Sequence, residues 1–189
     1  GKVATRDFFE KAVDFAKTNE LIVVQDAAHI MLTYEGEPLS FLSVPGAMDV
    51  GVEVHSLSKG YDMIGWRIGW VCGHERIVSA FADVKDNCDS GQFIAIQKAA
   101  AAALDNDEIP AQTRAKYQRR LEKLVATLKR CGFQCEMPGG TYFLYASNPK
   151  SAGDTKFENA EAASQFLITQ HSICTVPWDD AGAFLRFSV

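Results

Sequence analysis

A helix pattern followed at once by a short apolar strand pattern opens the chain and restricts what it can fold into. Apolar residues recur at helical spacing between Thr5, which can cap a helix, and Asn19. Residues 21–24 are all apolar and predict a buried strand, and residues 50–55 and 68–72 predict two more. This order of helix, buried strand, connection and buried strand indicates an α/β sheet.

The pattern changes along a long helix predicted for residues 111–130, which ends before Gly132. Strands are predicted at 133–136, 141–145, 173–176 and 184–189, a helix at 159–171, and irregular or loop segments at 34–48 and 146–157. We therefore expect two domains, an α/β part at residues 1–112 and a small α+β domain at residues 113–189. Because the chain opens without a strand and stops inside one, we expect a fragment whose small domain is truncated at its end.

Composition argues against several classes of function. The chain has 19 Lys and Arg against 24 Asp and Glu, and this net charge of −5 argues against nucleic-acid binding. No apolar run approaches the roughly 20 residues that span a bilayer, so no membrane interaction is expected. The five cysteines include no Cys-x-x-Cys pair, which predicts free thiols in a reducing cytoplasm and no metal site.

The segment around Lys59 carries the strongest chemical signal. Ser56 and Ser58 come just before this lysine, and Arg67 follows in a Gly-Trp-Arg-Ile-Gly element. A lysine amine can form a Schiff base with an aldehyde, while serine hydroxyls and arginine can hold a phosphate. Taken alone, Lys59 is equally a surface lysine, and Arg67 is equally a partner in a structural ion pair.

Three further residues suit the same kind of ligand. Asp26 follows a buried strand, where it can pair with a protonated ring nitrogen or simply form a turn. His29 can reach that ligand or be an ordinary packed or exposed histidine. Arg186 lies in an apolar strand and needs a carboxylate partner, which either the protein or a substrate can provide.

Together these motifs resemble the lysine signature of class I/II aminotransferases, which use pyridoxal 5′-phosphate (PLP) and have PLP fold type I. Asp26 and Arg186 stand where the family places its ring acid and its substrate-carboxylate arginine, and Pro138-Gly139-Gly140 with Phe143 resembles the family's small-domain strand. The resemblance implies a mixed, mostly parallel sheet with helices in the PLP-binding large domain, followed by the small domain.

The same resemblance implies a role for each candidate residue. Lys59 is the Schiff-base lysine and catalytic group, and Asp26 pairs with the ring nitrogen. Ser56, Ser58 and Arg67 hold the phosphate. Arg186 binds the α-carboxylate of the substrate.

Two departures from the family pattern stand out. The family has a tyrosine that hydrogen-bonds the phenolic oxygen of PLP, and this chain has His29 there, which can still donate a hydrogen bond. The family's glycine-containing phosphate loop, ring-stacking aromatic residue and cofactor-contacting asparagine lie upstream of this portion. We therefore expect the C-terminal part of such an enzyme, inactive by itself.

The implied activity is amino transfer between an amino acid and a 2-oxo acid, in amino-acid biosynthesis, by a full-length protein that is a homodimer. The signature, with residues 86–91, is similar to one branch of LL-diaminopimelate aminotransferases, and also to aspartate and alanine aminotransferases. Two alternatives remain open, a PLP-dependent β-lyase of the same fold and an aminotransferase-like PLP-binding domain of a transcription regulator.

Overall fold

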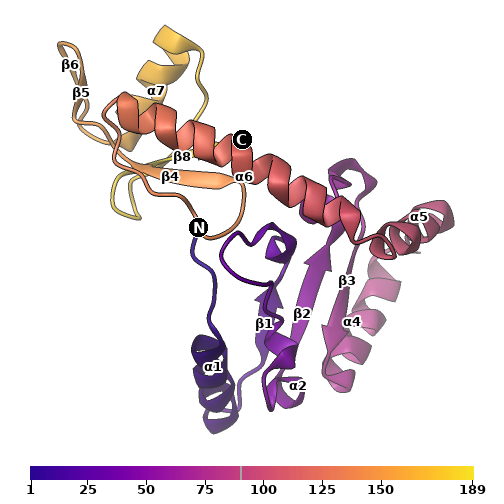
Figure 1. Ribbon diagram of the computed structural model, residues 1–189. Coiled ribbons are helices and arrows are strands. Elements are labelled where there is room, and N and C mark those ends of the chain that lie inside the picture. Colours follow the sequence, from indigo (N-terminus) through magenta and orange to yellow (C-terminus); the bar gives the residue numbers. More distant parts are fainter. Residues whose placement is uncertain (90) are drawn as a thin grey trace. The chain divides into compact units, whose positions relative to one another are not determined.

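The computed structural model describes residues 1–89 and 91–189, so Ser90 of the segment at 86–91 lies outside the described residues. The chain divides into two compact units, each with its own sheet (Figure 1). We call Val3–Arg114 the Lys59 unit, and Gly1–Lys2 with Ala115–Val189 the Arg186 unit. None of the helices in the described part of the chain is both long and apolar enough to span a membrane.

A mixed three-stranded sheet forms the centre of the Lys59 unit. Its strands are β1 (Val23–Asp26), β2 (Gly51–Ser56) and β3 (Gly69–Gly73), in the order β1-β2-β3. Strand β2 pairs with β1 in parallel and with β3 antiparallel. The expected α/β sheet is therefore present, with one parallel and one antiparallel pairing. The expectation of a buried strand at residues 21–24 was wrong, because Leu21, Ile22 and Val24 are exposed.

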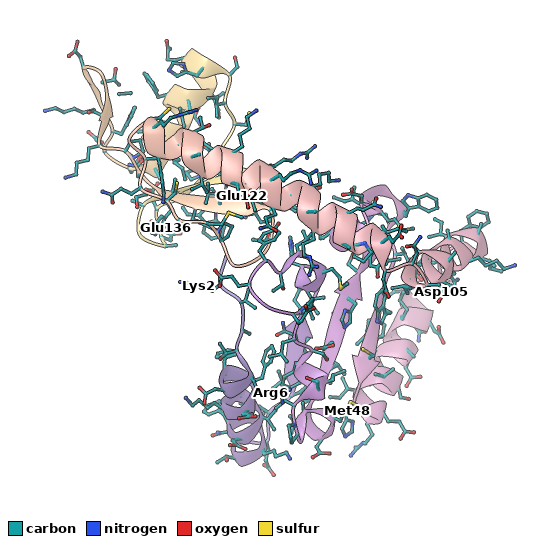
Figure 2. All side chains as sticks on the ribbon, viewed as in Figure 1. Lys2, Arg6, Met48, Asp105, Glu122 and Glu136 are labelled. Atoms are coloured by element: carbon teal, nitrogen blue, oxygen red, sulfur yellow. The ribbon has the colours of Figure 1, made fainter. Side chains whose placement is uncertain are left out.

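The Lys59 unit also contains three longer helices and several single turns. The helices are α1 (Arg6–Thr18), α4 (Glu75–Cys88) and α5 (Ile94–Leu104). Helix α1 begins as predicted, because Thr5 Oγ1 accepts the Phe8 N–H at 3.2 Å. The segment predicted to be irregular contains the short helices η2 (Phe41–Ser43) and α2 (Ala47–Val50), from which Met48 projects (Figure 2).

A small apolar cluster fixes α1 and this segment. Phe9 and Val13 of α1 pack against Phe41, Val44 and Ala47, all of them buried. The rings of Phe9 and Phe41 meet edge to face with their centroids 5.5 Å apart. The cluster holds the connection from β1 to β2 in place, and so helps to determine where β2 begins.

The Arg186 unit is built on an antiparallel sheet. Its strands are β4 (Phe143–Ser147), β8 (Phe184–Ser188) and β7 (Val176–Trp178), in the order β4-β8-β7. Helix α7 (Ala160–His171) and most of α6 (Glu108–Arg130) accompany the sheet. Leu121, Val125 and Leu128 form the buried side of α6, as its leucine spacing predicts.

Two expectations for this unit were wrong. The strand predicted at 133–136 is only an isolated bridge between Cys135 and Ala146 in the described chain. The segment next runs into Pro138, which lacks the N–H that would continue a ladder. The loop predicted at 146–157 contains a small hairpin, β5 (Ser151–Ala152) with β6 (Thr155–Lys156).

Side chains on the outer side of α6 are polar. Arg119, Arg120, Lys123, Lys129 and Arg130 are exposed. Glu122 stands on the same helix, and Glu136 accepts a 3.3 Å hydrogen bond from Lys129 Nζ (Figure 2). These basic side chains thus belong to the solvated face of the helix.

Candidate functional site

Lys59 lies in a tight turn that follows β2 directly. Ser56 ends β2 and caps the single-turn helix α3 (Leu57–Gly60), since its Oγ accepts the Ser58 N–H at 3.1 Å. Gly60 closes this turn against Met31, where an added Cβ would stand 2.6 Å from the Met31 Cβ. The partly buried Lys59 side chain is therefore presented from a backbone that is fixed on both sides.

Arg67 approaches the same turn from the following segment. It follows the short helix η3 (Ile64–Trp66) in a left-handed conformation with φ of 52°. Its Nη1 donates to the Ile64 carbonyl oxygen at 2.9 Å and lies 3.4 Å from Ser58 Oγ. Within residues 1–89 and 91–189, no carboxylate forms an ion pair with Arg67, so the structural ion pair is not realised. The exposed guanidinium stands beside the serine hydroxyl as a group able to bind an anion.

Asp26 is the last residue of β1 and is exposed. Its Oδ1 accepts the Ala28 N–H at 3.1 Å, so Asp26 does form a turn. This hydrogen bond uses only one of the two carboxylate oxygens. The next residue, Ala27, donates its N–H to the Val54 carbonyl of β2 at 2.9 Å. This places the carboxylate at the carboxyl ends of two parallel strands, the edge where α/β sheets bind ligands.

His29 connects Asp26 and Lys59 electrostatically. Burial lowers the pKa of His29 below its ordinary value, and the positive charge of Lys59 lowers it further, while Asp26 acts in the opposite direction. The geometry agrees, because the turn that carries Lys59 meets Met31, two residues after His29, and His29 follows Asp26 by three residues. Neutral His29 offers one ring N–H donor and one ring nitrogen acceptor.

Arg186 lies in the other unit and is described by itself. It is partly buried on β8, with its guanidinium carbon 4.4 Å from the Phe143 ring centroid and 5.7 Å from that of Trp178. Of the two partners open to it, a protein carboxylate is not found within 4.0 Å in the described part of the chain. The aromatic faces offset part of the cost of burying this charge. They contact the face of the guanidinium, so the N–H donors at its edge can still bind a carboxylate.

The sequence analysis overlooked a polar cluster on the sheet of the Lys59 unit. Glu53 and His55 of β2 meet Trp70 and Cys72 of β3. The sequence contained one indication of this cluster. Glu53 and His55 are two positions apart on β2, as are Trp70 and Cys72 on β3, so the members of each pair lie on the same face of their strand. The register that joins the two pairs was not readable from either strand alone.

Known proteins similar to this chain share one family. A family model described as aminotransferase class I and II matches residues 1–189. The LL-diaminopimelate aminotransferases of Methanococcus maripaludis and Methanocaldococcus jannaschii are 57% and 54% identical to the chain. Both alignments cover 100% of this chain but 45% of the relative, so the chain spans less than half of their length.

Solved structures agree with the sequence relatives. The apo form of BacF from Bacillus subtilis has a TM-score of 0.91 at 31% identity, covering 98% of this chain and 48% of that one. An aspartate aminotransferase double mutant from Thermus thermophilus has a TM-score of 0.87 at 26% identity, with 99% and 48% covered. The chain therefore belongs to the class I and II aminotransferase family.

Proposed function

We propose that this chain is part of an LL-diaminopimelate aminotransferase, which moves an amino group between an amino acid and a 2-oxo acid. The observation that carries the proposal is the grouping of Lys59 with His29 and Asp26, next to the turn where Arg67 meets Ser58. The substrate comes from the names of the two relatives at 57% and 54% identity. Because these relatives are more than twice as long, the activity of the whole protein remains a proposal.

Class I and II aminotransferases are PLP-dependent, and the residues of the Lys59 unit fit this cofactor. Lys59 provides an amine for the aldehyde, and Asp26 an exposed carboxylate for the ring nitrogen. Arg67 and Ser58 converge as anion-binding groups for the phosphate. When bound, PLP supplies an electron sink for the bond that breaks at the substrate Cα.

Within this proposal each residue of the Lys59 unit has a separate task. Lys59 Nζ would hold the cofactor through its aldehyde carbon, and the amine would serve as the base and acid for the Cα proton. Asp26 keeps a proton on the ring nitrogen through its negative charge. His29 donates its single ring N–H to the oxygen on the cofactor ring. Ser56, whose Oγ caps α3, holds Ser58 in place for the phosphate.

Arg186 is proposed to bind the substrate α-carboxylate. Its guanidinium can form two parallel hydrogen bonds to a carboxylate, which orients the Cα bond that breaks. The rings of Phe143 and Trp178 lie close enough to the guanidinium to favour its position by cation–π attraction. Such an ion pair between Arg186 and the substrate would distinguish an α-amino acid from an amine that lacks the carboxylate.

Two further parts of the proposal concern the whole protein. We propose a homodimer, as is usual for the family, with the domain boundary near residue 112. The five cysteines, all among the described residues, are free thiols, which supports a reducing compartment such as the cytoplasm.

The test uses the full-length protein and its Lys59→Ala variant. The near-visible absorption of covalently bound PLP is expected in the wild type and lost in the variant, while Lys98→Ala, an exposed lysine of α5, retains it. An unchanged absorption band in Lys59→Ala would show that another residue binds the cofactor.

Product analysis decides the reaction class and the substrate. Incubation of LL-diaminopimelate with a 2-oxo acid is expected to yield the new amino acid, with aspartate and alanine as poorer donors. Pyruvate and ammonia released from one amino acid without any 2-oxo acid acceptor would identify a β-lyase instead. Cofactor binding without turnover of any donor would favour a regulator domain.

A further inference from the structure

Three chemically different donor groups converge on one face of the sheet in the Lys59 unit. Glu53 and His55 lie on β2, and Cys72 on β3 stands directly opposite Glu53 in the antiparallel register. One carboxylate oxygen, one ring nitrogen and the thiol sulfur lie within 4.8 Å of one another. We propose that Glu53, His55 and Cys72 bind a divalent transition-metal ion, with Zn²⁺ as the best match.

Glu53 is held in place as a metal ligand would be. It is 2% exposed, and its Oε1 accepts the Phe41 N–H at 2.5 Å. Its other oxygen, Oε2, points to His55 Nε2 at 2.9 Å. Hydrogen bonds of this kind to the far side of a ligand orient it toward the ion.

His55 is oriented just as firmly. Its ring lies flat on the Trp70 indole, with a centroid distance of 4.9 Å and an interplanar angle of 5°. Trp70 is the residue opposite His55 on β3, so the stack is built into the strand pairing. Without an ion, the hydrogen bond between His55 and Glu53 joins the two side chains, and a bound ion takes the place of that shared proton.

Donor chemistry favours zinc over harder ions. A carboxylate oxygen, an imidazole nitrogen and a thiolate form the mixed set that Zn²⁺ accepts, with water in the fourth position, whereas Mg²⁺ and Ca²⁺ prefer oxygen alone. Ligand atoms around a tetrahedral zinc ion are about 3.5 Å apart. Cys72 is a free thiol, and a bound ion would have to draw the three donor atoms closer than the 4.8 Å within which they now lie.

The proposed site is separate from the proposed transamination. Successive side chains of a strand point to opposite faces, so Glu53 and His55 face away from Val54 and Ser56. Asp26 is paired with Val54 in the register and shares its face. The ion would join β2 to β3 behind the turn that carries Lys59, as a structural element, and the inference holds whether or not the chain transaminates.

The experiment titrates Co²⁺ into the full-length protein after chelator treatment and dialysis. One cobalt per chain is expected, with visible bands of a tetrahedral ion, which lie apart from PLP absorption, and a thiolate-to-cobalt band that Zn²⁺ displaces. Free Zn²⁺ should also raise the thermal midpoint, increasingly with its concentration.

Two variants test proposed ligands, and a third is a control. Cys72→Ser exchanges one sulfur atom for oxygen, so the fold should be retained; it should abolish the thiolate band and weaken cobalt binding by at least about tenfold. His55→Gln should weaken binding by a similar factor. Cys135→Ser, a buried thiol of the Arg186 unit, is the matched control and should bind as the wild type does.

Either of two results would overturn the proposal. The first is the absence of stoichiometric cobalt binding in the folded wild type. The second is a thiolate band of full strength in Cys72→Ser.

Discussion

Arg67 combines an unusual backbone conformation with an exposed charge. A non-glycine residue with φ of 52° is uncommon, and here the side chain ties the turn together through Ile64 and Ser58. A lysine at this position would keep the positive charge, but it would lose the planar guanidinium that can donate two parallel hydrogen bonds to a phosphate. We expect Arg67→Lys to weaken PLP binding by about tenfold or more, measured by equilibrium dialysis.

Arg76→Lys is the matched control for this substitution. Arg76 is exposed near the start of α4 in the same unit and should tolerate the change. Equal PLP affinity in Arg67→Lys and wild type would remove Arg67 from the proposed phosphate site.

His29 makes the stability of the cofactor-free protein depend on pH. Its pKa is lowered in the folded chain from an ordinary value of 6.5, by burial first and by Lys59 second. The unfolded chain therefore binds the proton more readily, so the stabilising effect of neutral His29 is complete above about pH 6.5 and declines as the pH falls toward the folded pKa.

Urea unfolding of the cofactor-free protein between about pH 5 and 8 measures this effect. His29→Gln should show a smaller loss of unfolding free energy over the acidic part of that range than the wild type. Identical pH profiles for the two proteins would mean that His29 titrates alike in the folded and unfolded states.

Single residues with a local signature were the most predictable part of the site. The lysine and its serines form one short motif, and Asp26 follows an obvious strand. Glu53 could not be assigned in this way, because its partner Phe41 lies in a segment without periodicity. The left-handed conformation of Arg67 had no sequence signal either, since it arises from contacts with the turn.

At the scale of elements, α7 is capped by a distant residue as well as a local one. Asn159 caps the helix by accepting the Ala162 N–H at 2.9 Å. Asp179 also accepts the N–H groups of Ala160 at 2.7 Å and Glu161 at 3.1 Å. Its negative charge stands at the positive end of the helix dipole.

Removal of this second cap should be measurable. Asp179→Ala is expected to lower the free energy of unfolding by about 1–2 kcal/mol, by urea denaturation. The neighbouring Asp180 is exposed, and Asp180→Ala should change stability by less than about 0.5 kcal/mol. Equal effects from both substitutions would refute the capping role.

Helices were predicted correctly where the apolar residues kept a helical spacing over several turns. Helices α1, α6 and α7 all lie where they were expected, with ends that differ by a few residues. Short elements were missed, because one turn of helix or a two-residue strand has no period to detect. The helices η2 and α2 depend on the packing of Phe9 and Val13 instead.

On the scale of the whole molecule, each unit has a core of its own. Leu32 of the Lys59 unit and Leu185 of the Arg186 unit are both fully buried. Replacement of either leucine by alanine should cost about 2–5 kcal/mol. We expect hydrogen exchange to accelerate mainly in the unit that carries the substitution, because units with separate cores open separately.

Hydrogen exchange with mass spectrometry compares the two variants directly. Leu185→Ala should affect β4, β7 and β8, and Leu32→Ala should affect β1 and β2. Uniform acceleration across both units in either variant would show that the chain unfolds as one cooperative body.

Gly1 belongs to the Arg186 unit, where its carbonyl accepts the Gly139 N–H at 2.9 Å. During synthesis, Gly1 leaves the ribosome long before Gly139 exists, and at about 5–20 residues per second the wait is on the order of ten seconds. Residues 3–114 complete the Lys59 unit within that interval. The order of translation therefore favours folding of the Lys59 unit before the Arg186 unit, while Gly1 and Lys2 stay available for a unit that has yet to be made.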